Sequence, residues 1–304
     1  MNVAPHIFTL TGHLLAERTF EYASWSAGKT QRASSETFQV GGKGINVSKM
    51  LYRLGVANTA LCFAGGASGL ECEAWLQARR FSHRAFASDR GNRVGMVVRS
   101  ANHLETTFLG PDVAPSPEAV DACAAFLDAQ LDGQVLAFCG SFPSWEDIAY
   151  DGLRAALERW LRRGILAVDT YGPPLIWLTQ HPLGLAKINA IEFRALAGNA
   201  LSIAAALNSA SPTWPVARWV VSDGPGLVTF RDGPNGAPDS IMPPSVQEVS
   251  ATGSGDVLFA CLLQSLYVNQ TSLREALARA LPVAAANAAH PGIAEFPDPP
   301  DTAI

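Results

Sequence analysis

The stretch GGKGINVSKMLYRLGVANTALCFAGG, residues 41–66, contains the unit from which the fold can be inferred. A glycine turn leads into a segment whose apolar residues follow the i, i+3, i+4, i+7 spacing of an amphipathic helix, namely Val47, Met50, Leu51 and Leu54. Gly55 is typical of a helix end, and the apolar run TALCFAGG (59–66) is typical of a buried strand. The stretch therefore predicts a glycine turn, a helix and a strand in succession.

Short apolar runs of this kind alternate with helical segments along the rest of the chain. They predict strands at HIFTLTG (6–12), VLAFCGS (135–141), ILAVDT (165–170), LAKIN (185–189) and WVVSDG (219–224). A helix is predicted to begin after Ser116 as N-cap, with Pro117 at its first position. The alternation predicts an α/β fold in which helices cover both faces of a parallel sheet. Ligands on such sheets bind beyond the carboxyl ends of the strands, which here are small or polar.

Two regions interrupt this alternation. Residues 17–40 and 92–110 have the pattern of short strands with no helix between them. They could pair as a small antiparallel sheet outside the main one. A flap over an active site and a plain extension of the sheet edge explain this pattern equally well.

The composition narrows the classes of function. The chain has 304 residues, of which 48% are hydrophobic and 16% charged, as in an ordinary globular protein. A net charge of −5 gives no general attraction to nucleic acid or to an anionic membrane. We see no signal peptide, no apolar run long enough to span a bilayer and no metal-ligand spacing among the five cysteines. We therefore expect a cytoplasmic protein with neither nucleic-acid nor membrane partners.

A second glycine turn, TGSGD (252–256), precedes the apolar run VLFACLL. A glycine turn at a helix start exposes backbone N–H groups, and the helix dipole adds positive potential there, so the two together form an anion site. One interpretation is phosphoryl transfer, in which the amides hold the phosphoryl oxygens and Asp256 accepts the proton of the attacking hydroxyl. The alternative is that the glycines only form a turn and that Asp256 is only a first-turn residue favoured by the dipole.

The two glycine turns together favour the first interpretation. The earlier turn adds a cation, Lys43, and a polar side chain, Asn46, and two such turns suit a site for two substrates. Other phosphate-binding motifs do not fit. GSGDVL has Leu258 where a dinucleotide fingerprint needs glycine, and AGKT (27–30) has Ala23 where a P-loop needs its first glycine.

Both turns resemble the signatures of the PfkB or ribokinase family of carbohydrate kinases, most closely its 1-phosphofructokinase and tagatose-6-phosphate kinase branch. Further segments are similar to that branch in the expected order: FTLTGHLLAERTFEY, LETTFLGPDVAPSPEAV, CGSFPS, LAKINAIEFRALAG, VVSDGPG and AAANAAHPG. The resemblance implies a ribokinase-like three-layer α/β/α sandwich with a mostly parallel central sheet and a small antiparallel β lid. It implies a single domain over residues 1–304, with 17–40 and 92–110 inserted as the lid.

The resemblance assigns the chemistry to the second turn and the acceptor to the first. Asp256 would be the catalytic base, and an anion hole would be formed by the amides of Gly253, Ser254 and Gly255. The sugar would be bound by Gly41, Gly42, Lys43 and Asn46. For Asn46, an ordinary helix-start residue is the alternative.

The resemblance also implies ATP and Mg²⁺ as cofactors. Asn189 and Glu192 match an NxxE motif that orders the water shell of Mg²⁺, a hard cation often held through water and phosphate. ATP would be contacted by Lys187, Asn189, Ser222, Gly224, Gly226 and Asn287. The SDGPG loop is one residue shorter than usual, so the nucleotide geometry is expected to differ. A solvated glutamate, a surface lysine and a buried helix asparagine are the alternatives for Glu192, Lys187 and Asn287.

The acceptor phosphate would be bound by basic residues of the lid. Arg93 matches a lid arginine of the branch, and Lys29 lies near a lysine that some members use. Ser141 matches the serine of a GSLPP turn. An arginine fork suits a phosphate dianion, although exposed basic residues are more often simply solvated.

Four departures from the branch bear on the acceptor and the cofactors. The substrate loop, roughly NPALD in the branch, reads HLLAE, so Glu17 replaces a sugar-binding aspartate. His13 stands at the asparagine, either as a substrate contact or as a surface loop histidine, and Gly95 replaces a lid asparagine. Ser250 replaces an aspartate that helps bind a monovalent cation, which puts potassium activation in doubt. Since most changes surround the acceptor rather than Asp256, we expect a working kinase with an altered acceptor.

The predicted function is transfer of the γ-phosphoryl of ATP to a hydroxyl of a ketohexose phosphate. The expected acceptor is of the fructose 1-phosphate, fructose 6-phosphate or tagatose 6-phosphate type. Two alternatives stay open: a kinase for a free sugar such as fructose or ribose, or for a nucleoside, and a catalytically silent sugar-sensing homologue. Because lid strands of this family often form dimer contacts, a homodimer through the lid is one expected assembly.

Overall fold

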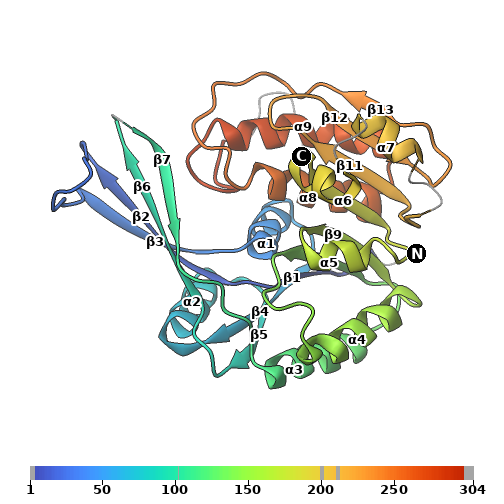
Figure 1. Ribbon diagram of the computed structural model, residues 1–304, viewed down its shortest axis with the longest axis horizontal. Helices are drawn as coiled ribbons and strands as arrows, with labels where there is room; N and C mark the ends of the chain where they lie inside the picture. The colour runs from blue at the N-terminus through green and yellow to red at the C-terminus, as the bar shows by residue number, and fades with distance from the viewer. Residues whose placement is uncertain (1–3, 102, 199–201, 210–212, 298–304) are drawn as a thin grey trace.

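The computed structural model describes residues 4–101, 103–198, 202–209 and 213–297. Its centre is a nine-stranded sheet in the order β13-β12-β11-β10-β9-β8-β1-β4-β5 (Figure 1). The strands from β11 to β5 are parallel, and β12 and β13 extend one edge in the antiparallel sense. In chain order these strands are β1 (Ile7–Thr11), β4 (Asn58–Gly65), β5 (His83–Ser88), β8 (Val135–Gly140), β9 (Ile165–Thr170), β10 (Leu185–Asn189), β11 (Arg218–Ser222), β12 (Val228–Asp232) and β13 (Asp239–Ile241).

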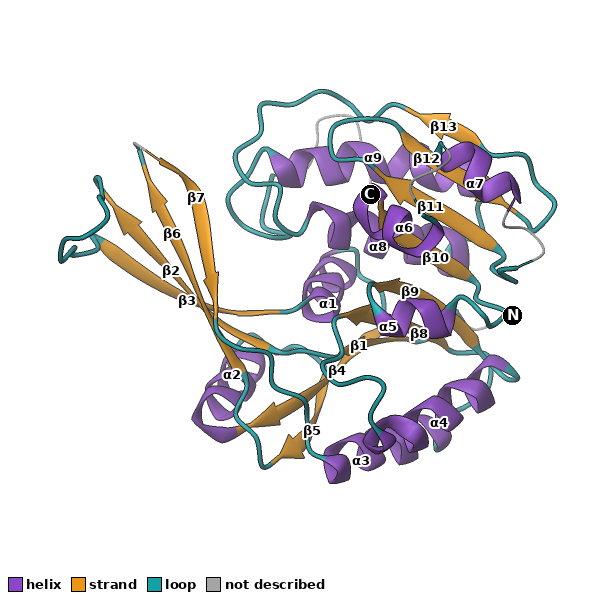
Figure 2. Ribbon diagram, viewed as in Figure 1, coloured by secondary structure: helices purple, strands orange, loops and turns teal. Residues whose placement is uncertain are grey.

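Helices cover both faces of this sheet, which gives the three layers expected from the sequence (Figure 2). One face carries α3 (Pro117–Asp128), α4 (Asp151–Leu161), α5 (Pro173–Leu178), α6 (Ala190–Ala197) and α7 (Ile203–Ser209). The other face carries α1 (Lys43–Arg53), α2 (Gly66–Ala78), α8 (Ser254–Leu263) and α9 (Leu273–Ala288). A 3-10 turn, η1 (Ile148–Tyr150), precedes α4, and a π-helical turn, η2 (Gln264–Val268), follows α8.

The alternation of side chains along each strand buries apolar residues on both faces of the sheet. In β8, Leu136 and Phe138 pack among α3 to α6, whereas Val135, Ala137 and Cys139 pack against α1, α8 and α9. Every residue of β8 is therefore buried, which explains its continuous apolar sequence. In the described part of the chain, no helix combines the length and the hydrophobicity that crossing a membrane would require.

The strand order places a crevice at the carboxyl ends of the central strands. β1 pairs with β4 on one side and with β8 on the other, so the chain order reverses between β1 and β8. Such a switch point opens a crevice at the carboxyl edge of the sheet, where loops diverge to either side. β8, β9 and β10 end at the same edge, with Gly140, Thr170 and Asn189 as their last residues.

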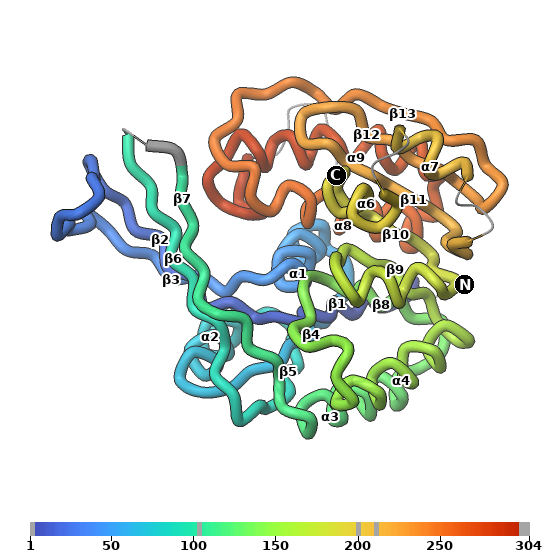
Figure 3. The backbone as a smooth tube through the Cα atoms, in the orientation of Figure 1, coloured from blue at the N-terminus to red at the C-terminus, as the bar shows by residue number. Residues whose placement is uncertain are grey.

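The lid is a separate four-stranded sheet in the order β3-β2-β6-β7, which stands out from the large sheet in Figures 1 and 3. Its strands are β2 (Leu15–Tyr22), β3 (Ser35–Gly41), β6 (Arg93–Ser100) and β7 (His103–Leu109). The two outer pairings are antiparallel as expected, but β2 and β6 run parallel. Both strands leave the same edge of the parallel sheet, after β1 and β5 respectively, which gives them one direction.

Candidate active site

A cleft of about 770 Å³ lies between the lid and the carboxyl edge of the large sheet. Both glycine turns line it: Gly41 and Gly42 lead into α1, and residues 253–255 lead into α8. Segments that are far apart in the sequence therefore face one cavity. This is the arrangement on which the interpretation as a two-substrate site depends.

The turn before α8 requires glycine at position 253. Gly253 is the N-cap residue and has φ of 77°, in the left-handed region that favours glycine. A Cβ at this position would lie 2.6 Å from Cγ2 of Ile293. The turn is therefore fixed both by its backbone conformation and by close packing.

The free amides of this turn differ from those expected. The amide of Ser254 donates to the carbonyl oxygen of Ala251 at 3.2 Å, so it is not available to a ligand. Among the described residues, the amides of Gly253, Gly255 and Asp256 have no acceptor. The start of α8 thus leaves three backbone amides without an acceptor, and the amide of Asp256 is free where that of Ser254 was predicted to be.

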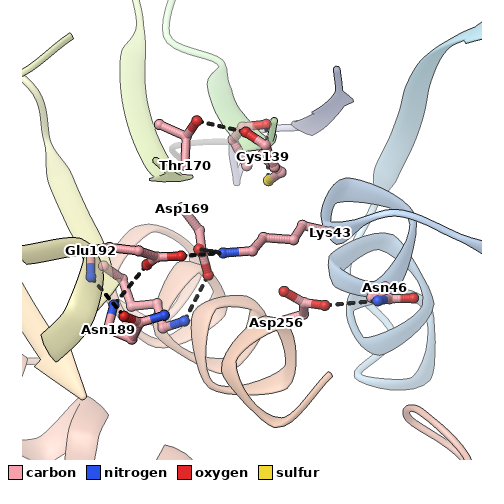
Figure 4. A network of polar contacts seen from close by, with 11 residues as sticks. Lys43, Asn46, Cys139, Asp169, Thr170, Asn189, Glu192 and Asp256 are labelled. Carbon is pink, nitrogen blue, oxygen red and sulfur yellow. Dashed lines mark hydrogen bonds and ion pairs between the residues drawn. The ribbon is translucent and has the colours of Figure 1, made fainter. Parts of the chain in front are cut away.

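Asp256 lies in the first turn of α8 and is largely buried, yet it lines the cleft. Asn46 of α1 donates from Nδ2 to Oδ2 of Asp256 at 2.7 Å (Figure 4). Burial, together with the charge of Asp169, raises the pKa of Asp256 to about 6, whereas Lys43, Asn46 and Lys187 act to lower this pKa. The carboxylate is therefore ionised at neutral pH and has a pKa suited to a general base.

Asp169, the penultimate residue of β9, is a functional candidate that the sequence analysis misses. Its side chain is fully buried, and Oδ1 and Oδ2 accept hydrogen bonds from Nζ of Lys43 and Nζ of Lys187, each at 2.7 Å. Burial disfavours its charged form, but the two lysines hold the pKa of Asp169 below its usual range. The available signal was the polar end of the apolar run ILAVDT, at the sheet edge where ligands bind.

The NxxE residues form a helix cap. Oδ1 of Asn189 accepts from the amide of Glu192, and Oε2 of Glu192 accepts from the amide of Asn189, both at 2.9 Å, which is a reciprocal capping box at the start of α6. The other oxygen of Glu192 lies 3.3 Å from Nζ of Lys43. Within the described ranges, no group of three acidic, histidine or cysteine side chains could chelate a metal directly. The carboxylate of Glu192 is a hard oxygen donor that fits a Mg²⁺ ion held through water, whereas both oxygens of the fully buried Asp169 are bound to lysines.

On the nucleotide side, the structure places some of the expected residues at the cleft and others away from it. Lys187, Asn189, Ser222 and Gly224 line the cleft, whereas Gly226 does not. Apolar side chains form much of the neighbouring wall, including Val228, Met242, Val246, Leu281 and Ile293. Such a wall suits the flat face of a nucleobase.

Asn287 of α9 does not line the cleft but binds the turn from behind. It is fully buried, and its Nδ2 donates to the carbonyl oxygen of Thr252 and to Oγ of Ser254, each at 3.1 Å. Its Oδ1 accepts from the amide of Ala294 at 2.9 Å. Asn287 therefore supports the glycine turn before α8, whereas the resemblance implies contact with adenine.

On the acceptor side, Glu17 and Arg93 line the cleft. Arg93 donates from Nη1 to Oδ1 of Asp112 at 2.9 Å. Lys29 lies in the exposed loop between β2 and β3, and Ser141 follows β8, and neither side chain lines the cleft.

His13 is buried beside the cleft rather than exposed in a surface loop. Its Nε2 accepts from the amide of Val113 at 3.3 Å, and its Nδ1 lies 3.4 Å from Oδ1 of Asp112. Burial and the charge of Arg93 lower the pKa of His13 to about 4, despite the opposing effect of Asp112. His13 is therefore neutral at pH 7, and it lines a separate cavity of about 10 Å³.

At Gly95 of β6, neighbouring side chains fill the space beside the backbone. A Cβ at this position would lie 3.0 Å from Cδ1 of Leu15 and 3.3 Å from Cδ2 of Leu109. Two leucine side chains thus occupy the space that an asparagine would need. The lid is therefore more apolar here than the resemblance implies, and Leu15 also lines the cleft.

Comparison with known proteins agrees with this geometry. Residues 10–299 match the family model described as pfkB family carbohydrate kinase. A 1-phosphofructokinase of Rhodobacter capsulatus is 28% identical over 278 residues, which cover 85% of this chain and 83% of that protein. A 1-phosphofructokinase of Bacillus subtilis is 28% identical over 198 residues, 64% of this chain and 64% of that protein. The tetrameric inhibited form of phosphofructokinase-2 from Escherichia coli superposes with a TM-score of 0.85, 23% identity and 94% coverage of both chains. This chain belongs to the pfkB family of carbohydrate kinases.

Proposed function

We propose that the protein transfers the γ-phosphoryl group of ATP to a hydroxyl of a ketohexose phosphate, of the fructose 1-phosphate, fructose 6-phosphate or tagatose 6-phosphate type. Membership of the pfkB family carries the general reaction, an ATP-dependent phosphoryl transfer to a sugar hydroxyl. The observation that supports the detailed proposal is the position of Asp256. It faces the cleft at the start of α8 and is bonded to Asn46 from the other glycine turn.

Asp256 is the proposed general base. With a pKa of about 6 it is ionised at neutral pH, so it can accept the proton of a sugar hydroxyl as that oxygen attacks phosphorus. The free amides of Gly253, Gly255 and Asp256 are suited to hold the oxygens of the phosphoryl group. Lys43 and Lys187 add positive charge at the floor of the same cleft.

Mg²⁺ is the expected cofactor, and it would supply charge neutralisation on the phosphate oxygens when bound. Asn189 and Glu192 are proposed to hold it through water. Glu192 is suited to this because its Oε1 lies 3.3 Å from Nζ of Lys43, which lines the cleft, and its Oε2 is fixed by the cap.

The lid, residues 17–40 and 92–110, is proposed to close over the acceptor and exclude water within a single ribokinase-like domain. Contacts across the cleft support this role. Glu105 of β7 accepts from Oγ of Ser250 at 3.3 Å and from Oγ1 of Thr252 at 3.4 Å. Arg99 of β6 donates to Oε2 of Glu105 at 2.7 Å and to the carbonyl oxygen of Pro291 at 2.8 Å. The lid thus reaches the loop that carries the anion-binding turn.

Two features support a phosphorylated acceptor. Arg93 lines the acceptor end of the cleft, and its counter-ion, Asp112, is largely exposed. A phosphate dianion could therefore replace Asp112 as the partner of Arg93. Curated relatives are named 1-phosphofructokinase, D-tagatose-1-phosphate kinase and ATP-dependent 6-phosphofructokinase isozyme 2. The alternative acceptor is a free sugar or a nucleoside. In that case Arg93 would stay paired with Asp112 when the acceptor binds.

The proposal is tested by measuring ADP release with ATP and Mg²⁺ across fructose, ribose, fructose 1-phosphate, fructose 6-phosphate and tagatose 6-phosphate. We expect a ketohexose phosphate to give the highest kcat/KM. Arg93→Met should raise the KM for that substrate and leave the KM for ATP unchanged. Equal activity on fructose and on its phosphates would contradict the proposed acceptor, and no ADP release with any sugar would contradict the proposed function.

A homodimer through the lid is the proposed assembly. The lid face turned away from Glu17 exposes Val94, Met96 and Phe108, and Met96 lies opposite Phe108 in the β6–β7 register. Adjacent exposed apolar side chains on one face are typical of a surface that is covered in an assembly.

A further inference from the structure

Lys49 is a buried cation that the mechanism proposed above does not use. The sequence contains four lysines, Lys29, Lys43, Lys49 and Lys187, and Lys43 and Lys187 bind Asp169. Lys49 lies on α1, is 7% exposed, and has its ammonium group 5.1 Å from the centre of the Trp75 ring. Because burial of a charge without a partner is costly, its one hydrogen bond indicates what it does.

That hydrogen bond leads to the acceptor end of the cleft. Nζ of Lys49 donates to Oε1 of Gln39 at 3.4 Å, the only hydrogen bond of its side chain within the described residues. Nε2 of Gln39 donates in turn to Oε1 of Glu17 at 2.5 Å. Gln39 and Glu17 are direct partners in the β2–β3 register, so the two side chains lie on one face of the lid. Hydrogen bonds therefore link three side chains in series from α1 to the wall of the cleft.

The order of donors in this chain fixes the orientation of the Gln39 amide. With its carbonyl oxygen toward Lys49, the amide presents N–H to the carboxylate of Glu17. The reversed amide would place its oxygen against the carboxylate and its N–H groups against the ammonium, and both hydrogen bonds would be lost. Lys49 therefore determines which side of Gln39 faces Glu17.

The charges around Lys49 come from four elements. Glu17 of β2, Asp256 of α8 and Glu295 after α9 favour its charged form, and Arg79 at the end of α2 opposes it. Burial is the largest influence and lowers the pKa of Lys49 to about 8. The ammonium form therefore prevails at neutral pH and is lost a little above it.

We propose that Lys49, acting through Gln39, is a positioning residue for the acceptor. It fixes Glu17 so that one carboxylate oxygen is bound to Gln39 and the other is available to a sugar hydroxyl. Glu17 lines the cleft, and its Oε2 has no partner among the residues that the structure describes. Glutamate has one more rotatable bond than the aspartate expected at this position, so a fixed orientation matters more. The inference rests on the proposed function, since it assigns a sugar hydroxyl to Glu17.

The test is steady-state kinetics of Lys49→Met with the best sugar of the panel and ATP varied separately. We expect the acceptor KM to rise about tenfold, as for loss of a hydrogen bond to a charged group, with kcat and the KM for ATP changed by less than about twofold. In the wild type the acceptor KM should also rise as pH increases through about 8, because Lys49 loses its charge. In Lys49→Met this rise should be absent, and Lys49→Arg should restore part of the affinity.

Two controls separate positioning from a structural effect. Arg84→Met removes one positive charge from an exposed position on the edge strand β5 and should change neither KM. Lys49→Met removes a buried charge, so its melting temperature at pH 7 should not fall. If it nevertheless fails to fold, Gln39→Ala provides the same test, because it removes the side chain that links Lys49 to Glu17 by hydrogen bonds.

The outcomes distinguish this inference from the proposed function. An unchanged acceptor KM in Lys49→Met, with normal wild-type turnover, would overturn the positioning role alone. An equal rise in the KM values for sugar and ATP would also overturn it, since it would indicate a general disturbance of the fold. No wild-type turnover, together with no calorimetric binding of fructose 6-phosphate, would overturn the proposed function and this inference with it.

Discussion

At the scale of single residues, the central feature is a carboxylate that stays ionised in a buried position. Asp256 is 6% exposed, and its neighbour Asp169 adds a second negative charge nearby. Lys43, Lys187 and the amide of Asn46 oppose these effects, so the pKa of Asp256 is raised only to about 6. The carboxylate of Asp256 is therefore mostly protonated in mild acid and mostly ionised at neutral pH.

The first prediction concerns the pH dependence of the reaction. We expect kcat/KM to rise with pH through an apparent pKa of about 6 and to level off near neutral pH, because only the ionised carboxylate accepts a proton. Near pH 8 the higher acceptor KM expected from the loss of charge on Lys49 should lower kcat/KM again. Asn46→Ala removes a hydrogen bond that favours the ionised form, so the rise should move to higher pH. The measurement is kcat/KM for the sugar between pH 5 and 8, a range that includes pH values below and above the pKa of Asp256. A profile unchanged in Asn46→Ala would show that this hydrogen bond does not tune the base.

The second prediction concerns Asp169 as the partner of two lysines. Asp169→Asn leaves Lys43 and Lys187 without their shared counter-ion, so we expect the free energy of unfolding to fall by about 3–5 kcal/mol. Denaturant unfolding measures this. Asp128→Asn, which breaks an ion pair with Arg159 at the surface, is the matched control and should cost about 1 kcal/mol or less. Similar losses in the two variants would contradict the special role of the buried site.

The sequence predicts some of these residues and not others, for a physical reason. Asp256 and Asn46 stand in glycine turns at helix starts, a local pattern with a known electrostatic consequence. The role of Asp169 depends on two lysines brought from other elements, which no local pattern indicates. For Asn287 the resemblance implies a place beside adenine and leaves a buried helix asparagine as the alternative; in the structure its side-chain amide donates to Thr252 and Ser254 behind the turn.

At the scale of elements, α1 connects the parts of the site. It carries Lys43, Asn46 and Lys49 at steps of three residues, so successive side chains reach Asp169, Asp256 and the Glu17 side of the lid. The helix can begin here because Gly42 has φ of 114°, and a Cβ at that position would lie 2.7 Å from Cγ2 of Thr11. The close approach of β1 to α1 thus depends on glycine at position 42.

The third prediction tests the contact between the lid and the α8 turn. Glu105→Gln weakens the bonds to Ser250, Thr252 and Arg99, so the lid should close less firmly. We expect a higher acceptor KM and a larger share of ADP released without acceptor, since water enters an open site. Both quantities come from one coupled assay at saturating ATP.

The control for the lid contact is Glu36→Gln. Glu36 forms an ion pair with Arg18 within the lid, and this is the side-chain contact that Glu36 makes among the described residues. This variant should leave both quantities unchanged. Equal effects of the two variants would indicate that general lid stability matters and that the contact across the cleft does not.

At the scale of the whole molecule, the sequence predicts the large sheet better than the lid. Continuous apolar strands separated by helices indicate parallel pairing, and β8 and β10 have the buried pattern expected. The parallel pairing of β2 with β6 could not be predicted from the sequence pattern of these strands. It depends on the directions in which two strands leave the large sheet, and these directions are set by the assembled fold.

The fourth prediction concerns the assembly. If the lid forms a homodimer, Phe108→Glu places a charge in the apolar face that includes Val94 and Met96 and should yield a monomer. Light scattering after size-exclusion chromatography measures the mass directly. Ile148→Glu changes an apolar side chain outside the lid that is more exposed than Phe108, and this control should leave the mass unchanged. A wild-type monomer would rule out this interface.

The most direct test of the central claim is the rate of Asp256→Asn, measured as ADP release with ATP, Mg²⁺ and the preferred sugar. The substitution keeps the size of the side chain and its contact with Asn46 but removes the base. The rate should fall by about 10² to 10⁴, with ATP binding largely retained and no loss of thermal stability at pH 7, where a buried charge has been removed. An Asp256→Asn variant that keeps most of the wild-type rate would contradict the claim that Asp256 accepts the proton of the sugar hydroxyl.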